Sequence, residues 1–464
     1  MALSFLETVV IIIGAGPAGI AIATCLNLLS IPNIVLERED CIASLWKKNS
    51  YDRLKLHLAK KYCTLPHMPF PSHFPTFVSK YMFIQYLDNY VAQFNINPLY
   101  SRSVESASYD GGKKWKVAVR NAGSGEMEVF EGRFLVVATG ENCEGFVPKV
   151  LGLEGYGGEL LHSSEYDNGS MYRGKDVLVV GCGNSGMEIA YDLCNCGARA
   201  AISVRSPVHV LSKEMVQLGM SMLKFLPCNV VDKIVQTLTK FTYGDLSPHG
   251  LQTPSNGPFY LKGITCRSPV IDVGTVEKIK TGDIRVFPSI MSIDGDNIEF
   301  ANGTTSKFHA IVFATGYKSN VRKWLKDDGA LFNEDGMPEK RSPNHWKGEN
   351  GLYCVGFARA GLFGISNDAQ NIAKDIRSIS PILSPQKDFK QPPSSPELKE
   401  TPIDVYDEAM DSLFESMKAN VSGFVYGASE SGVGSSSQIT FTPKEITQAK
   451  EVFKAVFKKD VKNG

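Results

Sequence analysis

Apolar residues gather in short runs along the first part of the chain, and glycines separate these runs. Residues 9–13 (VVIII) form an uninterrupted apolar run, which the glycine-rich turn 14–19 closes. Apolar residues continue to about Leu29, and a strand-like run follows at residues 31–37 (IPNIVLE). Short apolar runs bounded by glycine predict buried strands, and the longer apolar segment between them predicts a helix. This stretch is therefore expected to fold as a βαβ unit.

The same order of elements recurs in the middle of the chain. Residues 176–180 (DVLVV) predict a strand, the glycine-rich turn 181–186 follows, and a helix and a strand over 200–204 complete the unit. Two more apolar strands, residues 134–140 (FLVVATG) and 311–316 (IVFATG), end in the same Ala-Thr-Gly. We expect these two strands to carry the chain between the two βαβ units. The two units themselves form an internal repeat.

Both glycine-rich turns have the spacing G-x-G-x-x-G, and each follows a predicted strand and opens a predicted helix. In this context the pattern is typical of dinucleotide binding. The first glycine permits a tight turn, the second lets the backbone approach a pyrophosphate, and the third allows close packing of helix and strand. The free N–H groups at the start of the helix then bind the anion. The residues assigned to nucleotide binding are Gly14, Ala15, Gly16, Pro17, Ala18 and Gly19 in the first site and Gly181, Cys182, Gly183, Asn184, Ser185 and Gly186 in the second.

The residue that ends the second strand of each unit distinguishes the two nucleotides. Glu37 lies where a carboxylate binds ribose hydroxyls, which suits FAD or NAD and would repel a 2′-phosphate; Arg38 beside it is assigned to the same site. Arg205 holds the matching position in the second unit, and an arginine can pair with a 2′-phosphate. We therefore predict FAD in the first site and NADPH in the second. A solvated charge without a ligand is the alternative for Arg205.

These assignments predict an α/β protein with two Rossmann-like dinucleotide-binding domains. The FAD-binding domain is expected to comprise residues 1–168 and 305–382, with an NADPH-binding domain, residues 169–304, inserted between them. Residues 209–262 are expected to be a helical insertion, in which Pro227 breaks the helix. The apolar stripe predicted for this core or lid helix comprises Val231, Ile234, Leu238 and Phe241.

The composition changes after about Ile382, and residues 383–464 are expected to form a C-terminal extension that begins as a Pro-, Ser- and Lys-rich linker. Thr442 and Glu445 have the spacing of a helix-capping pair, with a proline at the first helical position. This predicts an amphipathic helix over 442–459. It could contact the protein's own surface or a partner protein.

Composition and charge exclude several classes of protein. The 464 residues carry 49 basic and 49 acidic side chains, so no global attraction to nucleic acid or anionic membrane is expected. No apolar stretch approaches the roughly 18 residues that a membrane helix needs, and no basic segment marks a signal peptide. The ten cysteines form no C-x-x-C or C-x-x-x-x-C pair and no metal-binding spacing, so we expect reduced thiols, a cytoplasmic protein and no metal.

The segment between the two units resembles a known signature. Residues 156–166 (YGGELLHSSEY) are similar to the flavin-containing monooxygenase motif F-x-G-x-x-x-H-x-x-x-[Y/F], with Tyr156 in the place of Phe. Over roughly residues 8–380 the chain also resembles the plant YUCCA flavin monooxygenases. The blocks that carry this resemblance are 44–48 (SLWKK), 51–58 (YDRLKLHL), 137–142 (VATGEN), 183–188 (GNSGME), 269–275 (PVIDVGT) and 313–320 (FATGYKSN).

The YUCCA resemblance implies a monooxygenase that uses NADPH, FAD and O₂ to convert indole-3-pyruvate, an aromatic 2-oxo-acid, to the auxin indole-3-acetic acid. NADPH would reduce the flavin, O₂ would add at C4a to give a (hydro)peroxyflavin, and the peroxide would attack the ketone with loss of CO₂. The protein would supply position and shielding. The resemblance also implies roles for Trp46 at the FAD site, for His57 and Asn142 beside the flavin ring, and for His162 near the nicotinamide. Structural roles are the alternative for both histidines and Asn142.

Other functions remain open at this stage. The same class of enzyme could oxygenate nitrogen or sulfur in a different small substrate. A pyridine-nucleotide disulfide reductase has the same two glycine-rich turns, but the missing cysteine pair argues against it. A non-catalytic flavoprotein recruited through residues 383–464 is a further alternative.

Overall fold

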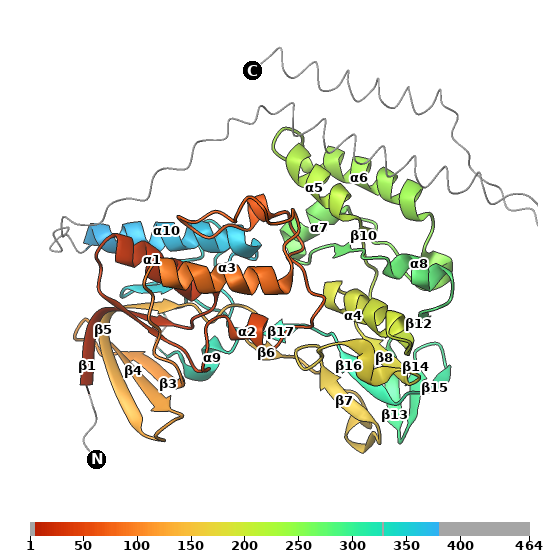
Figure 1. The fold of residues 1–464 in the computed structure, drawn as a ribbon, viewed down its shortest axis with the longest axis horizontal. Coiled ribbons are helices and arrows are strands. Elements are labelled where there is room, and N and C mark those ends of the chain that lie inside the picture. Colours follow the sequence, from red (N-terminus) through yellow and green to blue (C-terminus); the bar gives the residue numbers. More distant parts are fainter. Residues whose placement is uncertain (1–4, 327–328, 380–464) are drawn as a thin grey trace, which may run out of the picture. The chain divides into compact units, whose positions relative to one another are not determined.

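The computed structural model describes residues 5–326 and 329–379, which fold around two separate β-sheets (Figure 1). The expected linker and the helix over 442–459 lie outside the described residues. Among the described helices, none is long and apolar enough to cross a membrane. The predicted fold, two Rossmann-like domains with the second inserted into the first, is confirmed.

The first sheet is built around one long strand, β5. This strand pairs in parallel with β1 and β18 and antiparallel with β4. The parallel strands end level with one another, because Ile13 lies opposite both Leu36 and Val137, and Val137 lies opposite Cys354. The strand order is β2-β1-β5-β4-β3, with β18 beside β5. The strands are β1 (Phe5–Ile13), β2 (Asn33–Leu36), β3 (Arg102–Tyr109), β4 (Trp115–Asn121), β5 (Met127–Val137) and β18 (Leu352–Cys354).

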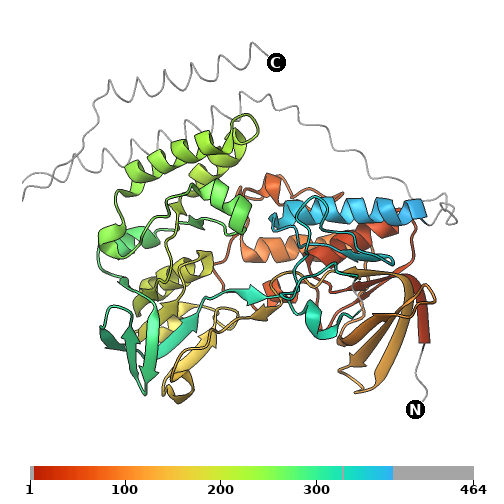
Figure 2. The same ribbon diagram turned by 180° about the vertical axis from the view of Figure 1, so that it is seen from behind.

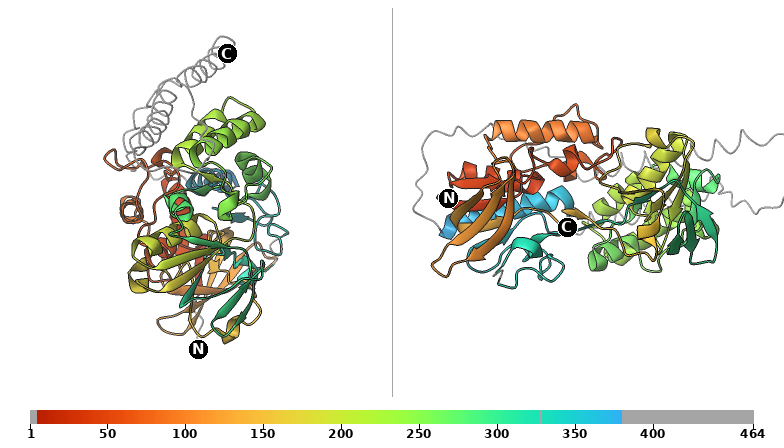
Figure 3. Two further views of the ribbon diagram at one scale, coloured as in Figure 1. Left: turned by 90° about the vertical axis from the view of Figure 1, so that its right-hand side faces the viewer. Right: turned by 90° about the horizontal axis from the view of Figure 1, so that it is seen from below.

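Three helices gather on one face of the first sheet (Figures 1 and 2). They are α1 (Pro17–Leu28), α3 (Lys80–Gln93) and α10 (Gly361–Ile379), and α10 runs beside α1 (Figure 3). Helix α3 begins after Ser79, whose Oγ accepts a hydrogen bond from the Met82 N–H at 3.4 Å and so caps the helix. Helix α10 buries a stripe at helical spacing, namely Ala369, Ile372, Ala373 and Ile376. Two shorter helices, α2 (Ser44–Lys47) and α9 (Val321–Trp324), lie in the connecting segments.

The second sheet is wholly parallel, in the order β12-β9-β8-β16-β7. Its strands are β7 (Glu159–His162), β8 (Asp176–Val180), β9 (Arg199–Ser203), β12 (Arg285–Phe287) and β16 (Ala310–Phe313). Strands β7 and β16 fall on the FAD side of the expected boundaries at 168/169 and 304/305, yet both are hydrogen-bonded into this sheet. The expected boundaries are therefore too narrow for the second domain, because pairing between distant strands leaves no local signal in the sequence.

Helices flank the second sheet, and an antiparallel sheet lies in sequence between two of its strands, β12 and β16. Helix α4 (Asn184–Asn195) follows β8, and α8 (Thr275–Lys280) follows the short pair formed by β10 (Val210–Leu211) and β11 (Val270–Ile271). The antiparallel sheet contains β13 (Ile290–Asp294), β14 (Asn297–Phe300) and β15 (Thr305–Lys307). The expected helical insertion contains α5 (Lys213–Met222), α6 (Cys228–Tyr243) and α7 (Pro258–Thr265), and α5 and α6 lie side by side in both Figures 1 and 2.

The break at Pro227 is confirmed, but the predicted stripe on α6 is offset from the buried face. That face carries Val231, Asp232 and Val235, whereas Phe241 is 51% exposed. The buried Asp232 carboxylate explains the offset, because it accepts hydrogen bonds from the N–H groups of the first residues of α7, Phe259 at 2.8 Å and Tyr260 at 3.0 Å. A polar residue on α6 therefore faces inward to cap a second helix.

The chain crosses between the two sheets twice, and the two crossings run side by side. Strand β6 (Glu144–Gly145) leads away from the first sheet and β17 (Tyr317–Lys318) leads back, and the two pair antiparallel. The Phe146 N–H also donates to the Gly316 carbonyl at 2.9 Å. The inserted domain thus leaves and rejoins the first domain at neighbouring points.

Candidate functional site

The three glycines of the first glycine-rich turn differ in how closely other atoms surround them. Gly14 has φ +106°, and a Cβ there would lie 2.8 Å from the Ala138 carbonyl oxygen. A Cβ on Gly19 would lie 1.8 Å from the Gly14 carbonyl oxygen. Gly16 differs, because a Cβ there would meet no atom within 4 Å. Packing of the protein therefore requires the first and third glycines, and the second faces open space of the kind that a pyrophosphate needs.

The second turn repeats this geometry. Gly181 has φ +113°, and its Cβ would lie 2.5 Å from the Ala314 carbonyl oxygen, while a Cβ on Gly186 would lie 2.0 Å from the Gly181 carbonyl oxygen. Gly183 again faces open space. Ala138 and Ala314 begin the two Ala-Thr-Gly runs, so each of these strand ends packs on the turn of its own sheet. Each strand therefore packs on a glycine-rich turn and also leads into one of the two crossings between the domains.

Helices α1 and α4 begin inside these turns, and their first N–H groups are suited to an anion. The N-cap residues are Gly16 and Gly183, neither of which provides a side-chain cap. The N–H groups of the first turn of each helix therefore need another acceptor, and the helix dipole favours a negative one. Open space at the second glycine and uncapped N–H groups fit a dinucleotide at each turn.

Glu37 is held beside the first turn at the end of β2. Its side chain is buried, with Oε2 accepting from the Ala15 N–H at 2.6 Å and Oε1 from the Glu39 N–H at 3.0 Å. Burial raises the pKa of Glu37, while these bonds and the charge of Arg38 lower it. Each carboxylate oxygen keeps a lone pair for a ribose hydroxyl. Arg38 is half-exposed and its Nη2 lies 3.4 Å from the Cys143 carbonyl oxygen.

Trp46 reaches the first turn through its own short helix, α2. The Ala43 N–H, at the start of α2, donates to the Ala15 carbonyl at 3.0 Å. The Trp46 ring is half-buried and packs edge-on against Phe83, with ring centroids 4.6 Å apart. The short helix that carries Trp46 is thus bonded to the first turn, and the Trp46 ring packs against the core of that domain.

Arg205 lies two residues beyond β9, at the carboxyl edge of the second sheet. Its side chain is exposed, and it has no ion pair or hydrogen bond with the residues that the structure describes. Asn184, in contrast, uses its Oδ1 to accept from the Ile271 N–H at 2.7 Å, which ties the second turn to the block 269–275. Burial raises the pKa of Cys182 to about 12, so this thiol stays protonated. A guanidinium that has no partner among the described residues can bind a 2′-phosphate.

His57 connects the first domain to the helix of the second turn. Its Nε2 lies 3.1 Å from Oε1 of Glu188, in α4; the His57 side chain is 31% exposed and that of Glu188 only 5%. Nearby, the Arg53 guanidinium stacks over the Tyr191 ring, also in α4, at 4.4 Å from its centroid. The segment 51–58 therefore reaches across to the second nucleotide site.

Tyr51 completes this contact. It belongs to the first part of the chain but packs into the core of the second domain, where its hydroxyl is buried. Burial and the nearby Glu188 charge raise the pKa of Tyr51 well above its ordinary value, and a hydrogen bond with Ser185 lowers this pKa in part. Sequence reasoning missed Tyr51 and Glu188. The available signal was a charged residue inside the otherwise apolar buried run 186–190.

The structure places His162 at the crossing between the sheets. Its Nε2 lies 3.0 Å from the Gly316 carbonyl oxygen and its Nδ1 2.9 Å from Ser164 Oγ. The ring packs edge-on against Tyr317, and a Cβ on Gly145 would lie 2.5 Å from Nδ1. Burial lowers the pKa of His162, and its bond to Gly316 opposes this. Both nitrogens already have protein partners, which is the setting of a structural histidine.

Asn142 lies on the loop after β5 and is exposed. The polar groups near it are more buried: Thr139 Oγ1 is buried without a hydrogen-bond partner among the described residues. The Cys143 thiol lies 2.8 Å from the Thr139 carbonyl oxygen. The orphaned Thr139 hydroxyl follows the strand that packs on the first turn, so it is a candidate contact for a bound flavin that the sequence did not single out.

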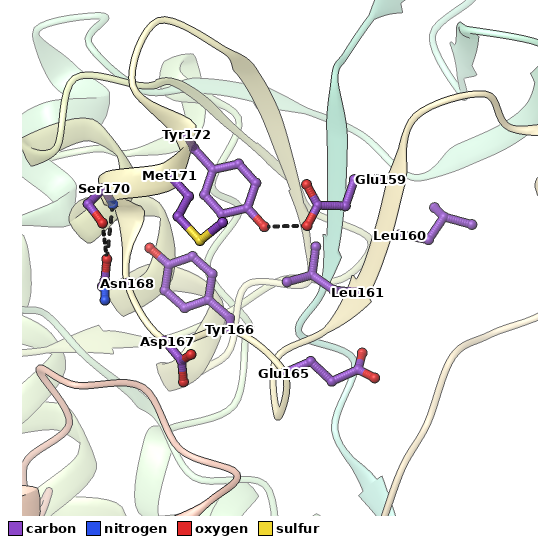
Figure 4. A pocket seen from close by; sticks show the side chains of 10 residues that line it. All are labelled: Glu159, Leu160, Leu161, Glu165, Tyr166, Asp167, Asn168, Ser170, Met171 and Tyr172. Carbon is purple, nitrogen blue, oxygen red and sulfur yellow. Dashed lines mark hydrogen bonds between the residues drawn. The ribbon is translucent and has the colours of Figure 1, made fainter.

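A surface pocket of about 300 Å³ lies away from both turns (Figure 4). Three carboxylates line it, and the Tyr172 hydroxyl donates to Glu159 Oε1 at 2.9 Å. It contains no residue of either turn, and its acidic character does not suit a nucleotide phosphate. Its lining residues are Glu159, Leu160, Leu161, Glu165, Tyr166, Asp167, Asn168, Ser170, Met171 and Tyr172.

Two Rossmann-like domains, each with a phosphate-binding turn at the carboxyl edge of its sheet, define a two-dinucleotide oxidoreductase. Residues 7–327 match the model of the flavin-binding monooxygenase-like family. The chain belongs to this family, and it is a flavin-dependent monooxygenase that uses FAD and NADPH.

Two relatives and one solved structure are similar to this chain over most of its length. The probable indole-3-pyruvate monooxygenase YUCCA10 of Arabidopsis thaliana is 55% identical over 376 residues, which span 81% of this chain and 98% of the relative. The indole-3-pyruvate monooxygenase YUCCA4 of Oryza sativa subsp. japonica is 48% identical over 381 residues, covering 79% of this chain and 86% of the relative. The structure of a flavin-containing monooxygenase from Stenotrophomonas maltophilia has the same fold, with a TM-score of 0.61 and 18% identity over 81% of this chain and 99% of the bacterial chain.

Proposed function

We propose that this enzyme converts indole-3-pyruvate to indole-3-acetic acid. One O₂, one NADPH and one proton are consumed with each 2-oxo-acid, and the products are indole-3-acetate, CO₂, NADP⁺ and water. One oxygen atom forms a bond to C2, the bond between C1 and C2 breaks, and the former carboxylate leaves as CO₂. The electrons from NADPH reduce the second oxygen atom to water.

The observation that carries this proposal is the 55% identity that extends over 98% of YUCCA10, a probable indole-3-pyruvate monooxygenase. The two turns, Glu37 and Arg205 lie within residues 7–327, which match the family model, and their geometry suits two different dinucleotides. We assign FAD to the turn 14–19 with Glu37, and NADPH to the turn 181–186 with Arg205. Bound FAD, reduced by NADPH, supplies the activation of O₂.

The chain's own residues bind and orient the reactants. The N–H groups at the starts of α1 and α4 bind the two pyrophosphates, and the Glu37 carboxylate orients the ribose of FAD. His57, fixed by Glu188 across the domain contact, restricts water at the junction of the two sites. Exclusion of water matters because activated oxygen otherwise escapes as H₂O₂.

Product analysis tests the proposal. Purified enzyme with FAD, NADPH and O₂ is supplied with indole-3-pyruvate or phenylpyruvate, and indole-3-acetate, phenylacetate, CO₂ and H₂O₂ are measured. We expect about one molecule of product for each NADPH consumed. If NADPH reduces the flavin but neither acid forms, the proposed reaction is wrong, and oxidation of an amine or thioether under the same conditions would identify an N- or S-oxygenating enzyme instead.

We also propose a cytoplasmic location. The ten cysteines are all free, and burial raises the pKa of several of them, including Cys25 and Cys63, to about 12. Unreactive reduced thiols fit a reducing compartment. A fluorescent fusion that co-sediments with an organelle would contradict this location.

A further inference from the structure

A group of three charged residues lies at the carboxyl edge of the first sheet, apart from the residues assigned to either nucleotide. Glu141 follows β5, and Arg359 follows β18, the parallel neighbour of β5. The Arg359 Nε lies 3.6 Å from Glu141 Oε2. Lys262, in α7 of the helical insertion, is the third member, and its Nζ donates to the Cys266 carbonyl at 3.1 Å. Helix α7 also contacts the first domain, because an arginine of that domain, Arg341, donates to an α7 carbonyl at 3.4 Å, and the Lys262 charge acts on Glu141.

The position of this group is suited to a ligand beside the flavin. Gly356, three residues before Arg359, packs against the first nucleotide turn, since a Cβ on Gly356 would lie 2.9 Å from Ala18 Cβ. Arg359 also lies just before α10, whose amino end favours an anion. In open α/β sheets, ligands bind outside the carboxyl ends of the strands.

The charges at this point do not balance. Two cations face one carboxylate, and the side chains remain accessible, with Arg359 40% and Glu141 30% exposed. Burial lowers the pKa of Lys262; the Glu141 charge opposes this effect and Arg359 adds to it. Burial likewise raises the pKa of Glu141, which Arg359 and Lys262 oppose. Among the described residues no carboxylate forms an ion pair with Lys262, so a second anion would relieve the excess positive charge.

We propose that Lys262 and Arg359 bind the carboxylate of the 2-oxo-acid substrate, and that Glu141 limits how tightly they hold it. This inference rests on the proposed function, because it takes its ligand from the proposed reaction. Two cations hold the substrate by the group that later leaves as CO₂. A carboxylate bound too firmly resists conversion to neutral CO₂, so a built-in counter-charge favours turnover.

Three variants test the site: Arg359→Gln, Lys262→Gln and Glu141→Gln. The probes are indole-3-pyruvate as substrate and two competitive inhibitors with the same ring, indole-3-propionate and its neutral amide. Loss of either cation is expected to raise KM for indole-3-pyruvate and Ki for the acid roughly 10- to 100-fold, because charge-assisted hydrogen bonds are lost. Ki for the amide should stay within about twofold. Glu141→Gln should act in the opposite sense, lowering both KM and kcat.

Arg341→Gln is the matched control, because the Arg341 guanidinium donates to the Ile264 carbonyl in the same helix α7 but does not pair with Glu141. Arg341→Gln should leave KM, kcat and both Ki values unchanged. In every variant, the rate at which NADPH reduces the flavin should also stay unchanged. Equal changes for the acid and the amide, or a change in KM for NADPH alone, would overturn the proposal. The Kd of each inhibitor, titrated directly against the oxidised enzyme, does not require turnover. A preference for the acid over the amide that depends on Lys262 and Arg359, while no indole-3-acetate forms, would therefore separate this inference from the proposed reaction.

Discussion

His57 and Glu188 are 131 positions apart in the sequence, yet His57 Nε2 lies 3.1 Å from Glu188 Oε1. The contact joins a segment of the FAD-binding domain to the helix that opens the proposed NADPH site. Glu188 is almost fully buried, and His57 provides a hydrogen-bond partner for its carboxylate. A change at either residue should therefore affect both nucleotide sites.

Replacement of His57 by alanine should uncouple the enzyme. We expect a smaller yield of product for each NADPH and a matching rise in H₂O₂, because water gains access to the junction of the sites. Stability should fall by on the order of 1 kcal/mol, since a buried carboxylate loses its partner. The exposed His73, on the same segment of chain, is the control, and His73→Ala should leave both quantities unchanged. Full coupling in His57→Ala would remove His57 from the mechanism.

Alanine at the second glycine of each turn should separate folding from nucleotide binding. Gly16→Ala should weaken FAD binding, and Gly183→Ala should raise KM for NADPH, each by at least about tenfold, because a methyl group fills the space beside the pyrophosphate. The apoprotein should keep its stability or gain about 0.4–1 kcal/mol. Equilibrium dialysis with FAD, steady-state kinetics and thermal unfolding measure these effects.

Gly19→Ala is the contrasting variant. Its Cβ would lie 1.8 Å from the Gly14 carbonyl oxygen, so the backbone must move. We expect a loss of stability of about 1–3 kcal/mol or more, without any dependence on added nucleotide. If Gly16→Ala destabilised the apoprotein as much as Gly19→Ala, the assigned roles of the three glycines would be wrong.

Arg205→Ala should reduce the preference for NADPH over NADH. An exposed guanidinium that contacts a 2′-phosphate contributes about 1.5–3 kcal/mol, which corresponds to a loss of roughly 10- to 100-fold in kcat/KM for NADPH and little change for NADH. Arg199 begins β9, the strand that precedes Arg205, but pairs with Asp176 at 2.5 Å, so Arg199→Ala is the control for charge alone. An unchanged ratio in Arg205→Ala would place the 2′-phosphate elsewhere.

His162 should make stability depend on pH. Burial lowers its pKa below the ordinary value of about 6.5, so the unfolded chain takes up a proton at a higher pH than the folded protein. Stability attributed to the neutral ring is present above pH ~6.5 and is lost as the pH falls through the lowered pKa. Urea unfolding of the wild type between about pH 5 and 7.5 should show this decline, and His162→Gln should flatten it.

His209 provides the comparison for this measurement. Its pKa is also lowered by burial, and its Nε2 lies 2.7 Å from the Asn256 carbonyl oxygen, away from the crossing between the sheets. Both His209→Gln and His162→Gln should reduce the slope of stability against pH. Only His162 lies at the crossing between the two sheets, so only His162→Gln should also change how the two domains are positioned. The rate of flavin reduction by NADPH measures this effect. Equal kinetics in the two variants would contradict a special role for His162.

The fold could be predicted because its main signals are local. Glycine spacing after a short apolar run imposes a strand, a turn and a helix within a few residues, and both turns occur where the spacing places them. Two strands of the second sheet, β7 and β16, fell outside the expected boundaries of that domain, because each pairs with a partner that is distant in sequence.

The site could be predicted only in part, for a related reason. Glu37 and Arg205 are fixed by their distance from the turns, so counting along the chain finds them. Glu188, Arg359 and Lys262 become relevant only when separate elements meet, and no local pattern encodes that meeting. The role of Asn142 stays a prediction: its motif suggests a flavin contact, and its side chain is exposed, while the nearby Thr139 hydroxyl is buried.

Because β6 pairs with β17, the inserted domain begins and ends at adjacent points of the first domain. Gly145 lies opposite Tyr317, so a short hairpin could replace everything between them and still return the chain to the first domain. Insertions of this kind disturb the host domain least when their two ends are adjacent. A lineage could therefore exchange the reductant-binding module, and with it the choice of nicotinamide coenzyme, without redesigning the oxygen-activating module that carries it.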